Sequence, residues 1–157
     1  MSIDALDARL IALLVAEPRI GVLECARRLR VARGTVQARL DKLVERGVVR
    51  GFGPDIDPAG LGYGVTAFVT LEISQRFGHD PVSAHLSDIP EVLEAHTITG
   101  SGDLLCRLVA RSNADLQRVI DLVVGHDGIV RASTIIALAE QIPLRTLPLV
   151  HAAATPV

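Results

Sequence analysis

The chain is poor in aromatic side chains and has no apolar run long enough to cross a bilayer. It has no tryptophan and a single tyrosine, Tyr63, among its 157 residues. Proteins that bind single-stranded nucleic acid by base stacking, or cations in aromatic cages, need more aromatic side chains than this. The first residues show no basic stretch followed by an apolar run, so we expect no secretory signal and a cytoplasmic location.

Residues that carry metal or nucleophile chemistry are also few. The two cysteines, Cys25 and Cys106, match no metal-ligand spacing, and we expect both to be buried thiols of a reducing compartment. His79, His85 and His96 do not repeat at ligand spacing, and no serine lies in a nucleophile elbow. We therefore predict no metal site, no cofactor and no catalytic residue.

The net charge of −2 conceals an uneven distribution of charge along the chain. Residues 1–52 carry an excess of four positive charges, whereas residues 53–157 carry an excess of six negative charges. A basic front on an acidic body is typical of a module that faces double-stranded DNA. Charge alone often marks only a solvated helical surface.

Residues 21–50 have the pattern of a helix-turn-helix. Apolar residues recur every three or four positions, which predicts one buried stripe on each of two short helices. The second helix presents cationic and amide side chains away from its stripe, and these suit phosphates and base edges in a major groove. The predicted DNA-binding residues are Arg33, Thr35, Gln37, Ala38, Arg39, Lys42 and Arg50.

Within this set, Arg33, Thr35 and Gln37 are the candidates for reading bases, because they lie early in the helix. Arg39, Lys42 and Arg50 are expected at phosphates. The alternative for Arg39 and Lys42 is intrahelical pairing with an acidic neighbour, Asp41 or Glu45. Arg27, Arg28 and Arg30 fit either a phosphate brace or a solvated face.

The elements around this motif follow from caps and breakers. A first helix is expected from Asp4, as its N-cap, to Ala16, before Glu17-Pro18. The third helix should stop at Arg46-Gly47, with a short strand over 48–52. We expect a DNA-binding domain over 1–50, a hinge over 51–64 that is rich in glycine and proline, a second domain over 65–141, and a tail over 142–157.

The second domain alternates strands and helices. Strands are predicted over 65–73, 92–98, 104–110 and 129–138, and helices over 80–86 and 114–124, the latter with Asn113 as its cap. The order β-α-β-β-α-β is that of the ferredoxin-like fold, so the whole chain is α+β. Several strands are apolar on both sides, which predicts helices on one sheet face and a second copy of the chain on the other.

At this point the chain resembles the Lrp/AsnC family of bacterial and archaeal regulators, from Ile3 to about Gln141. The resemblance lies in the order and spacing of several short pieces. These are Leu6-Asp7 with Leu10-Ile11, Arg19-Ile20, the run from Thr35 to Phe52, Asp57-Pro58 with Leu61-Gly62, and Thr99 to Leu105. It implies a winged-helix-like domain of three helices, joined by a hinge to a ferredoxin-like RAM domain. It also implies dimers and higher oligomers such as octamers, and an effector that is typically an amino acid.

The resemblance further implies an effector site between RAM domains. Its residues here would be Thr99, Gly100, Ser101, Gly102, Asp103 and Thr134. The two glycines let backbone N–H groups converge on a carboxylate, and Asp103 can meet an α-ammonium group. The alternative is that 100–103 is merely a hairpin turn in which Asp103 holds local backbone N–H groups.

One departure from the family pattern concerns Ala32, where many relatives have serine or threonine as the cap of the recognition helix. Alanine cannot accept that hydrogen bond, so we expect the side-chain cap to be lost.

Two other functions remain as alternatives. Sirohaem decarboxylases are similar in plan and have a histidine in the strand that holds His96. They also carry aromatic residues in the next strand, and residues 104–108 here contain none. A partner protein that binds an effector without DNA is the third hypothesis, and the basic helix over 33–46 disfavours it.

Overall fold

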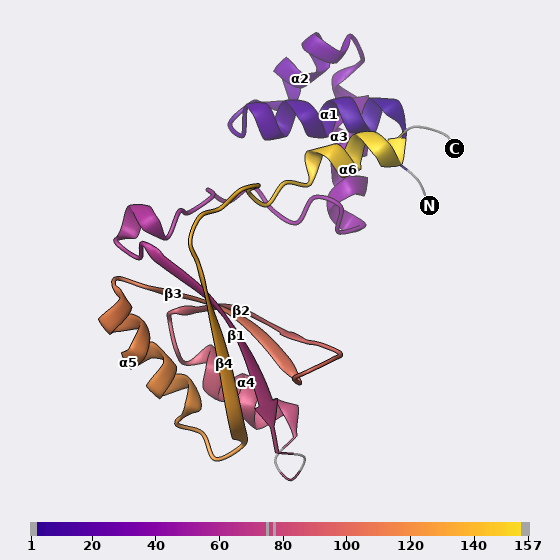
Figure 1. Ribbon diagram of the computed structural model, residues 1–157. Coiled ribbons are helices and arrows are strands. Elements are labelled where there is room, and N and C mark those ends of the chain that lie inside the picture. The colour runs from indigo at the N-terminus through magenta and orange to yellow at the C-terminus, as the bar shows by residue number, and fades with distance from the viewer. Residues whose placement is uncertain (1–2, 75, 77, 155–157) are drawn as a thin grey trace. The chain divides into compact units, whose positions relative to one another are not determined.

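The computed structural model describes residues 3–74, 76 and 78–154, which form two compact units (Figure 1). The first unit is built from the described parts of Met1–Pro54 and Ile142–Val157, and the second is Asp55–Gln141. The chain therefore leaves the first unit after Pro54, runs through the whole second unit, and returns to the first at Ile142.

All the regular elements among the described residues of the first unit are helices. It contains α1 (Ala5–Ala16), α2 (Val22–Leu29), α3 (Arg33–Glu45) and, near the C-terminus, α6 (Leu147–Ala154). The predicted helices over 4–16 and 21–46 are confirmed. Their apolar stripes meet in a core whose fully buried members are Leu10, Cys25, Val36 and Leu43.

The ends of these helices are fixed by local hydrogen bonds. Asp4 caps α1 as predicted, since its Oδ1 accepts the N–H groups of Leu6 (2.9 Å) and Asp7 (2.8 Å). Asp7 Oδ2 accepts the Asp4 N–H in return (3.1 Å), which completes a capping box. At the end of α3, Gly47 takes the left-handed conformation (φ 69°), as expected.

The predicted strand over 48–52 is wrong. The N–H groups of Val48 and Val49 both donate to the carbonyl of Leu43, at 2.9 and 3.1 Å, so they close the end of α3. The described residues of this unit supply no strand to pair with 48–52, and hence no strand-built wing.

The tail that the sequence left unassigned contains α6, which packs along α1 (Figure 1). Leu147, Val150 and Ala154 lie against the core of the first unit, whereas Leu149 points to solvent. Spacings of three and four residues place the three core-facing side chains on one face of the helix. Within the described residues, no helix has the length and apolar character that a membrane crossing requires.

The second unit is a four-stranded antiparallel sheet with two helices. The strands are β1 (Val65–Ile73), β2 (Val92–Thr97), β3 (Leu104–Ala110) and β4 (Ile129–Ala137), in the spatial order β2-β3-β1-β4. The helices α4 (His79–Ser87) and α5 (Asn113–Val124) cover one face, and a short 3-10 helix, η1 (Ala59–Leu61), precedes β1. This is the predicted ferredoxin-like order.

Alternation along β1 separates the two faces of this sheet. Ala67, Val69 and Leu71 are fully buried beneath the helices, and Phe68 on the other face is 38% exposed. The strand predicted over 65–73 is therefore confirmed, with one buried and one open face. Cys106 also lies in the buried layer, so both thiols are buried as expected, and burial raises the pKa of Cys106 to about 11.

The predicted cap of α5 is off by one residue. Ser112 is the N-cap, and its Oγ accepts the N–H of Asp115 at 3.1 Å, whereas Asn113 is the first residue of the helix. Both residue types are good caps, and only the backbone conformation decides between neighbours.

Candidate nucleic-acid interface and effector loop

The second helix of the helix-turn-helix, α3, offers a broad solvent-exposed surface. Val36 and Leu43 turn into the core, and six of the seven predicted DNA-binding residues are exposed. Arg39 is the exception, because it is half-buried. The exposed members are Arg33, Thr35, Gln37, Ala38, Lys42 and, beyond the helix, Arg50.

Helical geometry divides the candidates between two flanks of α3. With about 100° between successive residues, Thr35 and Gln37 are about 160° apart around the axis. Thr35 and Lys42 share one flank with Arg39, whereas Gln37 shares the other with Arg33. Ala38 lies between the flanks, and its small side chain leaves room for close approach of the helix to a ligand.

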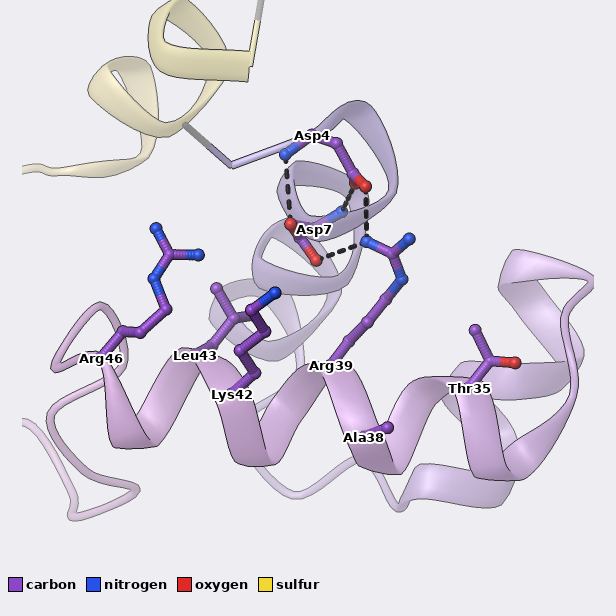
Figure 2. Close-up of a pocket in the computed structure, with 8 residues that line it drawn as sticks. All are labelled: Asp4, Asp7, Thr35, Ala38, Arg39, Lys42, Leu43 and Arg46. Atoms are coloured by element: carbon purple, nitrogen blue, oxygen red, sulfur yellow. Dashed lines mark hydrogen bonds and ion pairs between the residues drawn. The ribbon is translucent and has the colours of Figure 1, made fainter. Parts of the chain in front are cut away.

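The flank of Thr35 and Lys42 borders an open hollow of about 400 Å³ between α3 and the start of α1 (Figure 2). Figure 2 shows the side chains of Arg39, Lys42 and Arg46 rising from α3 on this side, with Asp4 and Asp7 on α1 beyond Arg39. Cations thus form one wall of the hollow, and two carboxylates stand opposite.

Arg39 spans this hollow at one end. Its Nη1 donates to Asp4 Oδ2 at 2.6 Å and to Asp7 Oδ1 at 2.8 Å. The intrahelical pairing considered for Arg39 is wrong, since its carboxylate partners belong to another helix. The hydrogen bond from the Asp7 N–H and the guanidinium of Arg39 lower the pKa of Asp4 below its ordinary value.

Other polar side chains of the helix-turn-helix also have partners within the first unit. Gln37 donates to Asp41 Oδ1 at 2.7 Å, which engages a predicted base-reading amide within α3 itself. On α2, Glu24 accepts hydrogen bonds from Arg27 and Arg28 at 2.8 to 2.9 Å, so these two arginines are partly neutralised. The hydrogen bond from Arg27, and next the one from Arg28, lowers the pKa of Glu24 to about 2.

In the second unit, the predicted effector loop joins β2 to β3 and folds against the end of β1. Gly100 has φ 117°, a conformation that other residues rarely adopt. Gly102 lies so close to β1 that a Cβ built on it would stand 2.2 Å from Thr70 Cγ2. Both glycines are therefore required by the path of the loop itself.

Asp103 ties this loop to β1. Its Oδ2 accepts the N–H of Ile73 at 2.7 Å, and its own N–H donates to the carbonyl of Leu71 at 2.8 Å. The alternative in which Asp103 holds local backbone N–H groups of the turn is not the contact seen here, because Ile73 lies on β1, 30 positions away. On β4, Thr134 pairs with Val69 of β1. In the sheet, β1 lies between β4 and the strand pair that the loop connects.

The histidine that raised the enzyme hypothesis lies on the edge strand β2. His96 is exposed, and its Nε2 is 3.5 Å from Glu94 Oε2. The neighbouring strand β3 places Leu105 opposite His96. Among the described residues, no three His, Cys, Asp or Glu side chains converge where they could hold a metal ion.

Comparison with known proteins gives this architecture its family. The AsnC-type helix-turn-helix domain matches residues 3–44, and the Lrp/AsnC ligand binding domain matches residues 66–147. The chain belongs to the Lrp/AsnC family. It is therefore a transcription regulator of the Lrp/AsnC type, with a helix-turn-helix domain and an effector-binding domain.

Curated relatives and solved structures agree with this assignment. The regulatory protein AsnC of Escherichia coli (strain K12) is 30% identical over 146 residues, which cover 92% of this chain and 95% of AsnC. The structure of E. coli AsnC superposes with a TM-score of 0.85 at 28% identity, over 94% of this chain and all of that chain. The feast or famine regulatory protein of Mycobacterium tuberculosis, solved with L-methionine, has a TM-score of 0.79 at 26% identity, over 90% of this chain and 96% of its own.

Proposed function

We propose that α3 of this Lrp/AsnC regulator enters the major groove of double-stranded DNA. The observation that carries this proposal is the exposed surface of α3, where Thr35, Ala38 and Lys42 stand clear of the core beside Arg46. Lys42 would contact phosphate, and Thr35 and Ala38 would approach base edges. Arg33 and Gln37 lie on the opposite flank and would reach other base edges in the groove.

Duplex binding can be measured by fluorescence anisotropy, with a random-sequence duplex and with a duplex selected from a random pool. Lys42→Ala is expected to weaken binding to both duplexes and to reduce the salt slope by about one. The matched control is Arg19→Ala, which removes one positive charge from the exposed turn between α1 and α2. Equal losses in the two variants, or no binding by the unaltered protein in dilute buffer, would refute the proposal.

Arg33 distinguishes base reading from phosphate contact. We expect Arg33→Ala to weaken binding to the selected duplex more than to the random one, because base contacts alone depend on sequence. An equal loss on both duplexes would reduce Arg33 to a phosphate contact.

We also propose that the second unit binds an amino acid at the loop 99–103, with Thr134 supplied across a RAM interface. The M. tuberculosis relative binds L-methionine in its structure, which makes methionine the first candidate. In an effector site between RAM domains, the loop and Thr134, which lie on either side of β1 within one chain, would come from different copies. Effector binding would then bias the arrangement of the copies and thereby their DNA-binding helices.

A thermal-shift screen of the twenty amino acids tests this site, since a ligand that binds the folded state raises the melting temperature. Asp103→Asn is the informative variant, because its amide oxygen can still accept the Ile73 N–H while the charge for an ammonium group is gone. It should abolish the shift and leave the melting temperature of the free protein nearly unchanged. Asp127→Asn, in the exposed turn before β4, should retain the shift; a normal response of Asp103→Asn would refute the assignment.

The open face of the sheet supports the proposal that the protein is a homodimer. On this face Phe68 of β1 lies opposite Ile135 of β4, and Ile135 is 66% exposed. A second copy that covers this face would remove both side chains from water. Paired DNA-binding units would then address successive major grooves, about 34 Å apart or a multiple of that distance.

A further inference from the structure

Among the phosphate contacts predicted on and after α3, Arg39 has carboxylate partners within the fold. Its guanidinium touches two carboxylates at 2.6 and 2.8 Å, and its side chain is only 30% exposed. To reach a phosphate, Arg39 would have to leave both carboxylates and swing out of the hollow shown in Figure 2. The observed arrangement therefore favours a role for Arg39 inside the protein.

Both carboxylates are themselves held in place, which makes the contact more than an ordinary surface ion pair. Asp4 uses Oδ1 to cap α1 and Oδ2 to accept from Arg39. Asp7 uses Oδ2 to accept the Asp4 N–H and Oδ1 to accept from Arg39. Because the capping box fixes both side chains, little conformational entropy remains to be lost when they pair.

The position of Arg39 along α3 connects this pair to the exposed surface. Arg39 lies one turn from Thr35 and one turn from Lys42, on the flank that borders the hollow. A tether to the start of α1 at this point resists rotation of α3 about its own axis. Rotation would move Thr35 and Lys42 together, out of register with a groove.

We infer that Arg39 is a positioning residue, which clamps α3 to the capping box of α1 and thereby sets the orientation of Thr35 and Lys42 toward DNA. This inference rests on the proposed DNA binding by α3. It replaces the phosphate contact predicted for Arg39, and it gives Asp4 and Asp7 a role in DNA binding although both repel phosphate.

Removing the charge of Asp7 distinguishes a clamp from a phosphate contact, because the two roles of Arg39 predict opposite changes in duplex affinity. If Arg39 is a clamp, Asp7→Asn weakens duplex binding by about threefold to tenfold, although the variant is more cationic. If Arg39 binds phosphate, Asp7→Asn tightens binding, since it frees the guanidinium and removes a repelling charge. Glu45→Gln, on the exposed surface of α3, is the matched control for the loss of one negative charge and should tighten binding.

Asp4→Asn guards against a simple folding defect. Asparagine caps helices as well as aspartate does, so α1 keeps its cap while one of the ion pairs with Arg39 is lost. Circular dichroism should show the same helical signal as the unaltered protein, and duplex binding should weaken as in Asp7→Asn. Tighter binding by either variant overturns the inference.

The salt dependence of binding supplies a second readout that a merely structural residue would not move. Arg39→Ala should weaken binding with an unchanged salt slope, and Arg39→Lys should recover part of the loss. A slope reduced by about one would make Arg39 a phosphate contact and overturn the inference. If the unaltered protein binds no duplex, the proposed function fails as well. If it binds duplex but Asp7→Asn or Asp4→Asn tightens that binding, only the clamp inference fails.

Discussion

Ala32 shows how a single residue weakens an element on which the function depends. It occupies the N-cap of α3 in the extended conformation that a cap requires, and it makes no side-chain hydrogen bond there, as predicted. A serine at this position could accept an N–H from the first turn. We expect Ala32→Ser to raise the free energy of unfolding of the helical unit by about 1 kcal/mol, measured by urea titration with circular dichroism at 222 nm.

The control is Gly21→Ser at the N-cap of α2, which also lacks a side-chain cap and has space for a larger residue. Glycine is a far better cap than alanine, so this change should gain only a few tenths of a kcal/mol. Equal gains at both positions would show that the Ala32 site has no special deficit.

Glu24 makes the free energy of unfolding of the helical unit depend on pH. Its hydrogen bonds from Arg27 and then Arg28 lower its pKa from 4.5 to about 2 in the folded protein. A lowered pKa means that the stabilising contribution is complete above about pH 4.5 and is lost as the pH falls toward 2. Glu24→Gln should therefore be less stable than the unaltered protein at pH 7, and the difference should vanish near pH 2 in urea titrations. A difference that stays constant over this range would contradict the assignment.

Residue-scale prediction from sequence succeeded where the partners are close along the chain. The caps at Asp4 and Gly47, and the missing cap at Ala32, follow from residue type and local position. Arg39 failed because its partner Asp7 lies 32 positions away, on a helix whose placement no local pattern reveals. The contact of Asp103 was equally hidden from the sequence, since its hydrogen-bond donor, the N–H of Ile73, lies 30 positions away on β1.

At the scale of elements, α6 is the part that the sequence did not reveal. Its residues form an apolar stretch with no charged face, so helical periodicity has no contrast to display. The strand predicted over 48–52 is not formed, because the N–H groups of Val48 and Val49 close the end of α3 instead. By contrast, β-branched residues predicted the strand over 65–73, and the period of two in strand geometry separates its buried side chains from those on the open face.

The contact of α6 with α1 predicts a stability effect on the DNA-binding unit. Val150 lies against the core of this unit, so Val150→Asp should cost about 1–2 kcal/mol and raise hydrogen exchange in α1. Leu149→Asp changes the adjacent exposed residue and should cost less than about 0.5 kcal/mol. If Val150→Asp left exchange in α1 unaffected, the docking of α6 would be refuted.

For the whole molecule, the path of the chain joins the two units twice. One connection follows Pro54, and the other precedes Ile142, where the chain returns from the end of β4 to α6. A change at β4, which carries Thr134, therefore has a direct covalent route to a helix packed on α1. This topology offers a physical basis for communication between an effector in the second unit and the helices that would hold DNA.

The same β4 carries the last prediction, which concerns assembly. Ile135 and Phe68 form an apolar pair on the sheet face opposite α4 and α5, and water covers that pair in a single chain. If this face joins two copies, Ile135→Glu buries an unpaired charge in an apolar interface in each copy. We expect sedimentation velocity to show a shift from dimer to monomer. Leu122→Glu puts the same charge on the outer surface of α5, where 45% of the leucine is exposed, and should leave the dimer intact. If Ile135→Glu stayed dimeric, the two copies would have to meet through another surface.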